Sequence, residues 1–438
     1  MRNIILLGVI AAFLALAIRR PFIGLLAWAW FTLMTPHQLA YGVFGLPLNL
    51  IIAAVTIGAF VLSSEFTRFR FDMMTVLIII FAGWLSISQA ASLDADESYI
   101  YFDRFIKTLL FVVLCIQMTT SKLRIHTLVW VLVAGIGFFA AKGALFTLAT
   151  LGEFRVQGLP DTIIEDNNHF ALAAATILPL ILYLRKEARY QWLRISLLAL
   201  FMLTVLAVLG THSRGGFVAL LAFCGVFWFR SRYKFALAAA LFALLVPAIA
   251  FMPAKWTERM ATITEAAQDQ SFMGRVDAWV INAKLAAKHP LTGAGLRNSY
   301  IEDVAATVDI ERSKTARAAH SIYFEILGGA GIAGLAIFIS MFAYSLFSCS
   351  RIIARRKDPA TPPWQPELAR GLQTSLIVFA VGGAAVSMEM WDGYLMIMGL
   401  TAALARMTTA RQTKKGLSLE KVRLGYLRRL KANPGEIT

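Results

Sequence analysis

The sequence predicts an all-α protein that is integral to a membrane and crosses the bilayer about twelve times. Of its 438 residues, 58% are hydrophobic and only 16% are charged, which is too apolar for a soluble domain of this length. Runs of about 17 to 25 apolar residues recur along the chain, and each can cross a hydrocarbon core of about 30 Å as a helix. Short basic clusters separate these runs, as expected for the connections of a polytopic helical protein.

We expect one helix from each apolar segment, in the order in which the segments occur. The segments are residues 3–18, 21–35, 46–62, 72–90, 105–119, 125–150, 168–184, 195–211, 214–229, 235–252, 320–349, 370–389 and 392–406. The sequence is compatible with twelve or with thirteen transmembrane helices, because Arg2 and the Arg19-Arg20 pair cannot both be cytoplasmic if residues 3–18 cross the bilayer. This N-terminal stretch also resembles a signal peptide, but we expect an uncleaved first helix.

The basic clusters predict which connections face the cytoplasm. They occupy every second connection, for example at Arg68 with Arg70 and in "RKEARYQWLR" and "RIIARRK", so the positive-inside rule places them in the cytoplasm. The remaining connections face outward, and only the stretch 253–319 is large enough to hold structure. The expected organisation is N-terminal transmembrane helices (1–252), a large outer loop with short helices (253–319), C-terminal transmembrane helices (320–408) and a basic cytoplasmic tail against anionic lipid (409–438).

Several function classes fit the composition poorly. The net charge of +16 comes from short clusters between apolar spans and not from one soluble face, so we expect no nucleic-acid partner. Cys115, Cys224 and Cys349 show no CxxC spacing, which argues against a disulfide framework or a thiolate metal site. The "DAD" at 94–96 is a weak match to a nucleotide-sugar motif, and no P-loop, GxGxxG or HExxH occurs. We therefore expect no metal and no cofactor.

Two arginines next to glycines are candidates for binding an anion. Arg214, in "THSRGG", lies near the outer turn between two short spans and precedes a helix whose positive dipole end faces the same spot. Arg275, in "GRVDAW", is expected at the start of a helix over 276–288, again beside a glycine. The alternatives are an interfacial arginine on lipid phosphate for Arg214, and a solvated or salt-bridged arginine for Arg275.

His320 is the candidate general base, because a neutral imidazole at the outer end of a helix can accept a proton from a hydroxyl group. A histidine that merely caps an interfacial helix is the alternative. Weaker candidates for binding a donor or acceptor share the outward face or interrupt an apolar run. They are Lys142, Arg155, Asn168, His212, Trp279 and Tyr323. N-capping is a sufficient explanation for Asn168.

Four motifs together resemble the O-antigen ligase and polymerase superfamily: "THSRGG", "GRxxxW", "HPLTGAG" and "HSxY", in this order over residues 150–400. WaaL-type O-antigen ligases share this architecture. The first half of the chain is similar to O-glycosylation ligases of exosortase-associated gene clusters, although "LGEF" and "GLPD" depart from that pattern.

The resemblance implies a glycosyltransferase of lipopolysaccharide biosynthesis in the bacterial cell inner membrane, with a periplasmic active site. The donor would be a glycan on undecaprenyl diphosphate, and the acceptor a sugar hydroxyl of lipid A core. In this chain His320 would be the base for an inverting, metal-independent transfer, and Arg214 and Arg275 would hold the diphosphate. Arginines suit this role because their planar donors grip phosphate and stay charged.

Three other functions stay open. An O-antigen polymerase uses the same donor but a second lipid-linked glycan as acceptor, and a protein O-glycosylation ligase differs in its acceptor. An anion transporter is the alternative that is not an enzyme, with Lys142, Arg155 and Arg214 along an anion pathway. A transporter should show repeat symmetry and polar residues near the midplane, whereas the polar residues here gather on the outward side.

Overall fold

The computed structural model of the protein describes residues 2–40, 45–231, 270–314 and 317–409, with a few isolated residues between 233 and 256. This part of the chain is all-helical, with 79% helix and no strand. The N-terminal half comprises α1 (Arg2–Arg19), α2 (Pro21–Met34), η1 (Pro36–Leu39), α3 (Leu48–Val61), η3 (Phe66–Arg68), α4 (Met73–Ala90), α5 (Ala95–Met118), α6 (Lys122–Ala149) and α7 (Asn167–Glu187).

The C-terminal half continues the bundle and adds shorter helices at one of its ends. It comprises α8 (Gln191–Gly210), α9 (Arg214–Arg230), α12 (Gln270–Lys288), η5 (Asn298–Tyr300), α13 (Glu302–Ala306), α14 (Ile310–Ser313), α15 (Ile322–Ala354), η6 (Arg355–Lys357), α16 (Trp364–Gly382), η7 (Gly383–Ala385) and a last helix over 392–409.

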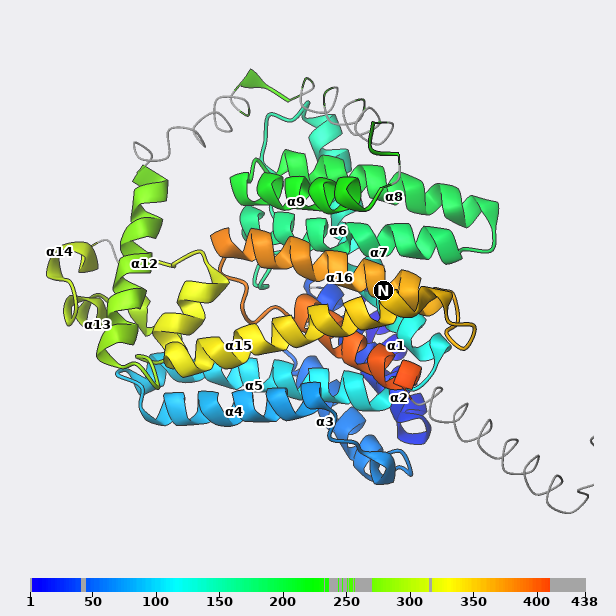
Figure 1. Cartoon of the computed structure of the whole chain (residues 1–438), viewed down its shortest axis with the longest axis horizontal. Coiled ribbons are helices and arrows are strands. Elements are labelled where there is room, and N and C mark those ends of the chain that lie inside the picture. Colours follow the sequence, from blue (N-terminus) through cyan, green and yellow to red (C-terminus); the bar gives the residue numbers. More distant parts are fainter. Residues whose placement is uncertain are drawn as a thin grey trace, which may run out of the picture.

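The long helices lie roughly side by side, and α12, α13 and α14 gather at one end of them (Figure 1). Helix α7 is the centre of the bundle, since α8, α16, α9 and α6 all pack against it. Its residues from Phe170 to Ile181 are all buried, and small side chains at Ala171, Ala173, Ala174 and Ala175 allow the neighbouring helices to approach closely.

Seven helices of the described part are long and apolar enough to cross a membrane: α1, α4, α6, α7, α8, α15 with η6, and α16 with η7. The expected segments 21–35 and 46–62 are helices of 14 residues, and 214–229 is a helix of 17 residues, so these fall short of that length. The segment 235–252 and the tail from 410 onward lie largely or wholly outside the described residues. The number of twelve spans therefore remains a prediction.

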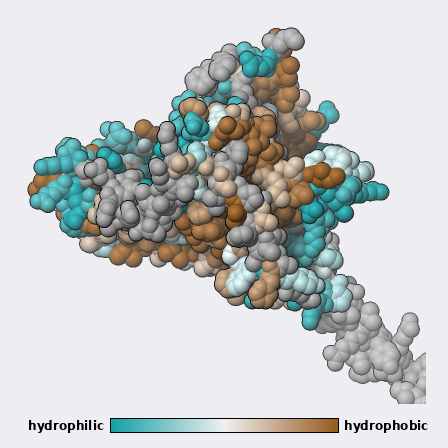
Figure 2. Space-filling view, turned by 90° about the horizontal axis from the view of Figure 1, so that it is seen from above, coloured by the Kyte–Doolittle hydropathy of each residue, from teal (hydrophilic) through white to brown (hydrophobic). Residues whose placement is uncertain are grey.

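Polarity is distributed along the long axis of the molecule as a membrane protein requires. In Figure 2 hydrophilic residues gather at the end where Figure 1 places α13 and α14, and hydrophobic residues cover much of the middle. Exposed large apolar side chains such as Ile80, Leu145 and Ile339 lie on the long helices α4, α6 and α15. A hydrophobic solvent around the bundle explains their exposure.

Two expected helix boundaries are wrong. The acidic stretch "SLDADES" at 92–98 is expected as an outward connection, but α5 already begins at Ala95. The Asp94 side chain caps this helix, because it accepts a hydrogen bond from the Glu97 backbone N–H at 3.1 Å. The helix expected over 276–288 includes Gln270, so Arg275 lies inside α12 and not at its N-terminus. Gly274 does not end the helix, because an isolated glycine costs only about 1 kcal/mol there.

The motif "HPLTGAG" joins the outer segment to α15 through backbone contacts. The N–H groups of Ala294 and Gly295 donate to the carbonyls of Gly328 and Gly329 at 2.8 and 3.1 Å, and Ile332 N–H donates to Pro290 O at 2.8 Å. Helix α15 breaks its helical geometry at Gly331, which has φ 73° and ψ −176°. These glycines are therefore explained by the close approach of two backbones and need no ligand.

Gly331→Ala is expected to destabilise the protein by about 3 kcal/mol or more, because this backbone conformation is open only to glycine and the new methyl group meets a carbonyl. An ideal Cβ would lie 2.1 Å from Leu291 O. The midpoint of thermal unfolding in detergent should fall clearly. Gly225→Ala is the matched control, since a Cβ there meets nothing within 4 Å. Equal midpoints for the two variants would contradict this account.

Candidate active site

The backbone next to His320 is held in place because both polar backbone groups of Ala319 are hydrogen-bonded. Trp279 Nε1 of α12 donates to Ala319 O at 2.7 Å, and the Ala319 N–H donates to Glu325 Oε1 at 2.9 Å. His320 itself has φ 46°, a left-handed conformation that is uncommon for a residue with a side chain. Strained backbone of this kind persists where its surroundings determine it, and functional sites are enriched in it.

The buried carboxylate of Glu325 connects three segments behind His320. Besides the Ala319 N–H, its Oε1 accepts hydrogen bonds from the hydroxyls of Tyr300 and Ser387, each at 2.6 Å. Glu325 is 3% exposed, so losing these donors would leave a carboxylate without compensation in the protein interior. The bonds therefore fix the first turn of α15 against η5 and against the segment after α16.

Arg214 and Arg275 approach the same short segment, residues 385–386. Helix α9 begins at Arg214, as the sequence predicts, and Ser213 caps it by accepting from the Gly216 N–H at 3.0 Å. A Cβ at Gly215 would lie 3.5 Å from Val386 and 3.7 Å from Ala385. Arg275 Nη1 donates to Ala385 O at 3.4 Å. The N-terminus of α9, which carries Arg214, and helix α12, which carries Arg275, therefore meet at the same end of the bundle.

The first turn of α7 lies beside the start of α9. Asp166 caps α7 by accepting from the Asn168 N–H at 2.8 Å, and Asn168 Oδ1 accepts from the Ser213 hydroxyl at 2.8 Å. His169, in the same turn, lies 2.8 Å from Ile163 O through its Nδ1. Because a carbonyl oxygen only accepts, this Nδ1 carries the proton and leaves Nε2 as an acceptor when the ring is neutral. Burial opposes ionisation of Asp166, but the Asn168 N–H lowers its pKa below the usual value.

A buried ion pair lies close enough to His320 to act on its charge. Arg297 Nη2 is 3.2 Å from Glu389 Oε1, and the guanidinium lies over the rings of Tyr101 and Tyr300, at 4.8 and 5.4 Å from their centroids. Burial alone would lower the pKa of Arg297, but the Glu389 carboxylate raises it above its usual value. Arg297 therefore stays charged and presents a rigid cation at this end of the bundle.

His320 is a neutral imidazole at physiological pH. Its pKa is lowered to about 4, mainly because burial disfavours the charged ring and secondly because the positive charge of Arg275 repels the imidazolium. His169 and Arg297 also lower this pKa, whereas Asp166 raises it. The Nδ1 atom is buried and has no hydrogen-bond partner among the described residues. The ring can therefore accept a proton, and the surrounding cations favour its release again.

A cavity of about 440 Å³ opens beside this cluster. Three of its lining residues, Asp166, His169 and Arg297, are close enough to His320 to act on its charge. We call it the Tyr101 cavity; it is lined by Tyr101, Arg104, Gln157, Thr162, Ile163, Glu165, Asp166, His169, Arg297 and Met390. One aromatic face among many hydroxyl-binding groups is a lining suited to a sugar ring.

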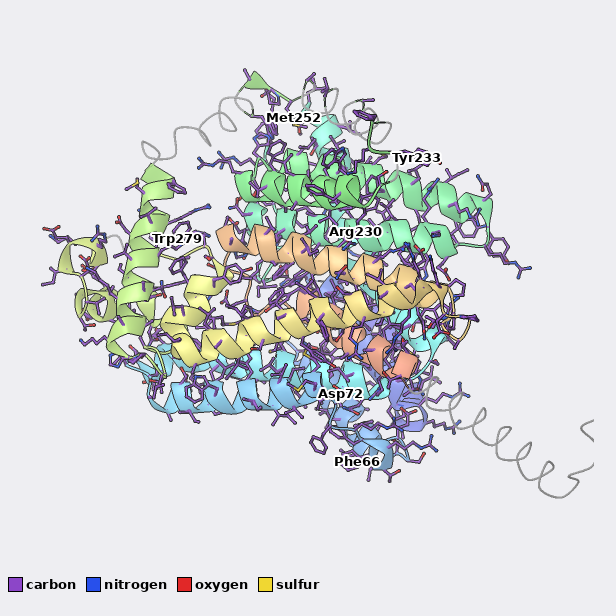
Figure 3. The ribbon with its side chains drawn as sticks, in the orientation of Figure 1. Phe66, Asp72, Arg230, Tyr233, Met252 and Trp279 are labelled. Atoms are coloured by element: carbon purple, nitrogen blue, oxygen red, sulfur yellow. The ribbon has the colours of Figure 1, made fainter. Side chains whose placement is uncertain are left out.

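Several of the weaker candidates have structural contacts. His212, with φ 53°, bonds through Nε2 to Gly152 O at 2.9 Å and ties the loop after α6 to the turn before Arg214. Trp279 stacks on Phe324 with ring centroids 5.3 Å apart (Trp279 is labelled in Figure 3). The Tyr323 hydroxyl donates to Ala380 O at 2.8 Å. These three side chains position the backbone near Arg214 and His320.

Arg155 and Lys142 lie at the edge of the site or beyond it. Arg155 is exposed and precedes Val156, whose N–H donates to Gly210 O at 2.9 Å next to the turn that leads to Arg214. Lys142 is exposed on α6. The double glycine also has a packing explanation, since a Cβ at Gly216 would lie 2.5 Å from Ala171 of α7.

Four residues of the site were missed from the sequence. His169 follows the asparagine pair directly in "EDNNHF", and Glu325 lies five residues after His320. Arg297 stands in the outer stretch 253–319, and Glu389 ends the apolar segment 370–389. An ionisable residue at the end of an apolar run was the available signal for each of them. No group of three or more His, Cys, Asp or Glu side chains is arranged to hold a metal ion within the described ranges.

The fold and the site define a class: a helical membrane protein with a neutral histidine, several arginines and a polar cavity at one end of its bundle. Residues 197–339 match the family described as O-antigen ligase, and this span contains Arg214, Arg275 and His320. The resemblance to the O-antigen ligase/polymerase superfamily is thereby confirmed, and the chain carries an O-antigen ligase domain. The match supports a function of the ligase or polymerase type and implies a glycosyltransferase-like enzyme.

The N-terminal part matches a different family. Residues 1–189 match a family of unknown function, DUF5935. The matched span contains Lys142, Arg155 and His169. A comparison with curated proteins finds no match. The narrower similarity of the first half to O-glycosylation ligases therefore stays a prediction.

Arg275→Gln is expected to raise the pKa of His320 from about 4 toward its ordinary value of 6.5, because it removes the cation that lowers this pKa most. Burial remains, so the pKa should stay below 6.5. Selectively labelled histidine side chains followed by NMR over pH 3.5 to 7.5 measure the shift. Lys284→Gln, on the same helix but paired with Asp309 at 2.8 Å, is the control and should leave the pKa unchanged. A fall in the pKa of the Arg275 variant would contradict the electrostatic account.

Proposed function

We propose that this protein is an O-antigen ligase that transfers a glycan from undecaprenyl diphosphate to a sugar hydroxyl of lipid A core. The observation that carries the proposal is the neutral, half-buried His320, close to Arg275 and to three residues of the Tyr101 cavity at one end of a membrane bundle. Such a base can deprotonate a hydroxyl without a nucleotide or a soluble domain, because a lipid diphosphate is already an activated leaving group.

The reaction divides between two groups of residues. His320 takes the proton of the acceptor hydroxyl as its oxygen bonds to the anomeric carbon, and the bond from that carbon to the diphosphate oxygen breaks with inversion. Arg214 and Arg275 bind the diphosphate and stabilise the charge that develops on it. Fixed arginines provide this charge in the place of a metal ion, so the proposed transfer is metal-independent.

The Tyr101 cavity provides the acceptor side of the site in this proposal. Its carboxylates Glu165 and Asp166 can accept hydrogen bonds from sugar hydroxyls, and Gln157 can both donate and accept. The outer core sugar would lie on the Tyr101 face that Arg297 does not cover, with one hydroxyl toward His320. Asn168 orients Asp166 next to this cavity, and its side chain amide donates to Asp166 Oδ1 at 2.8 Å.

The weaker candidates take peripheral roles in the proposal. Arg155, next to the turn before Arg214, would contact the donor diphosphate or its first sugar. Lys142, exposed on α6, would contact the donor only from the lipid side. The enzyme would lie in the bacterial cell inner membrane with His320 on the periplasmic side, which is the side opposite the basic clusters under the positive-inside rule.

An O-antigen polymerase is the second candidate, since the matched family is of the ligase or polymerase type. In that case the same His320 and arginines would act on a second undecaprenyl-linked glycan. The two functions differ only in the acceptor that enters the Tyr101 cavity.

His320→Ala is expected to lower the rate of transfer by about 10² to 10⁴, as for loss of a general base, and Arg214→Ala by about 10² to 10³, as for loss of one stabilising donor. The reconstituted protein, with EDTA present, would receive undecaprenyl-diphosphate-linked glycan and purified rough lipopolysaccharide, and the product is followed on gels. Arg351→Ala, at the other end of α15, is the control. If the wild-type protein lengthens only the lipid-linked glycan, the protein is a polymerase. If His320→Ala keeps its activity, His320 is not the base.

Gln157→Ala is expected to raise the KM for the acceptor about 3- to 10-fold with little change in kcat, because one hydrogen bond to the bound sugar is worth about 0.5 to 1.5 kcal/mol. Initial rates at varied concentrations of each substrate separate the two constants. Gln191→Ala, at the start of α8, is the control. A change in the donor KM alone would assign the cavity to the donor glycan.

A further inference from the structure

A second cavity lies at the end of the bundle away from His320. It has a volume of about 750 Å³ and is formed where α7 ends, α8 begins, α9 ends and α16 begins. We call it the Arg230 cavity; Arg230 is labelled in Figure 3, toward the end of α9 that lies away from Trp279. Helix α7 contributes His169 to the Tyr101 cavity and the stretch from Pro179 to Lys186 to the Arg230 cavity, so at 1.5 Å per residue the linings are about 15 to 25 Å apart along this helix.

The lining of the Arg230 cavity is strongly basic. Five of its residues are cations, namely Arg185, Lys186, Arg194, Arg230 and Arg370, and its one carboxylate is Glu367. Glu367 forms ion pairs of 2.9 Å with Lys186 and with Arg370. Glu367 therefore pairs with two of the five cations, and it is the one carboxylate in the lining.

Two of the remaining cations, Arg230 and Arg194, donate hydrogen bonds to neutral groups. Arg230 donates through Nη1 to Thr374 Oγ1 at 2.8 Å and through Nη2 to Gln373 Oε1 at 2.5 Å. Arg194 Nε donates to Ala188 O at 2.8 Å. Neutral acceptors orient these side chains but leave their charge uncompensated, and a phosphate group would compensate it.

A neighbouring cavity of about 630 Å³ extends the positive surface. It shares Arg230 and Arg370 with the first cavity and adds Arg356, and its lining contains no carboxylate within the residues that the structure describes. The two arginines that the cavities share therefore form a wall between two openings, each able to offer donors to an anion.

Part of the Arg230 cavity is apolar. Pro179, Leu182 and Phe227 line it on the side of the long helices α7 and α9. A free phosphate ion would gain nothing from these side chains, whereas an acyl chain would bury against them. The combination of a cationic rim, an apolar wall and a location at one end of membrane helices matches a lipid that carries a phosphate headgroup.

We propose that the Arg230 cavity is a binding site for one anionic phospholipid of the leaflet opposite His320. The phosphate would lie among Arg185, Arg194 and Arg230, and the first acyl carbons along Leu182 and Phe227. The bound lipid would link the ends of α7, α9 and α16, whose other ends carry the residues of the candidate active site.

The test measures lipid retention by the full-length protein in mild detergent, using native mass spectrometry with phosphatidylglycerol or phosphatidylcholine added at equal concentrations. Arg185→Gln/Arg194→Gln removes two exposed cations of the cavity. Arg189→Gln/Lys357→Gln removes two exposed cations at the same end that do not line it. Each basic residue near anionic lipid contributes about 1 kcal/mol to lipid binding. The Arg185→Gln/Arg194→Gln variant should therefore bind phosphatidylglycerol about 25-fold more weakly, and the Arg189→Gln/Lys357→Gln variant less than about 2-fold more weakly.

The expected result is one tightly held phosphatidylglycerol on wild type and on the Arg189/Lys357 variant, with loss in the Arg185/Arg194 variant. Equal retention of phosphatidylcholine, or equal loss in both variants, would overturn the proposal in favour of general surface charge. Displacement of the lipid by millimolar inorganic phosphate would overturn it in favour of a free anion. The readout involves no glycan transfer, so its failure is independent of the proposed function.

Discussion

One buried carboxylate, that of Glu325, is the constraint on which the arrangement around His320 depends. A carboxylate at 3% exposure requires hydrogen-bond donors, and three separate segments provide them through Ala319, Tyr300 and Ser387. The segments that carry His320, Arg297 and Glu389 are in this way joined at one point. The unusual backbone conformation of His320 is kept because both polar groups of the preceding residue are already bonded.

Glycines make this arrangement sterically accessible. The backbone of residues 290–295 lies directly on α15 where Gly331 interrupts the helix, and Gly216 lets α9 approach Ala171 of α7. Both contacts bring together elements that are far apart in sequence, and any side chain at these positions would separate them. The motifs "THSRGG" and "HPLTGAG" thus combine one candidate ligand residue, Arg214, with several residues whose role is packing.

The bundle carries two kinds of positive charge, one toward each of its ends. At one end the cations Arg275 and Arg297 surround a neutral histidine and polar cavity walls, and Glu389 fixes one of them. At the other end the cations of the Arg230 cavity outnumber their single carboxylate and lie beside apolar side chains. The first arrangement suits a charge that develops during a reaction, and the second suits a charge that is permanent on a lipid.

Local features of the sequence were sufficient to predict the helical membrane class, the helix that begins at Arg214, and the superfamily through motifs that lie in the matched span. Hydropathy and capping depend on neighbouring residues, so they can be read along the chain. The partners His169, Glu325, Arg297 and Glu389 depended on the tertiary structure, because they meet His320 only after residues 166–169, 297–300 and 387–389 are packed together. The tertiary structure also decided that Trp279 and His212 anchor the backbone and that Arg275 lies within α12. Side-chain contacts between distant segments leave no periodic signal in the sequence.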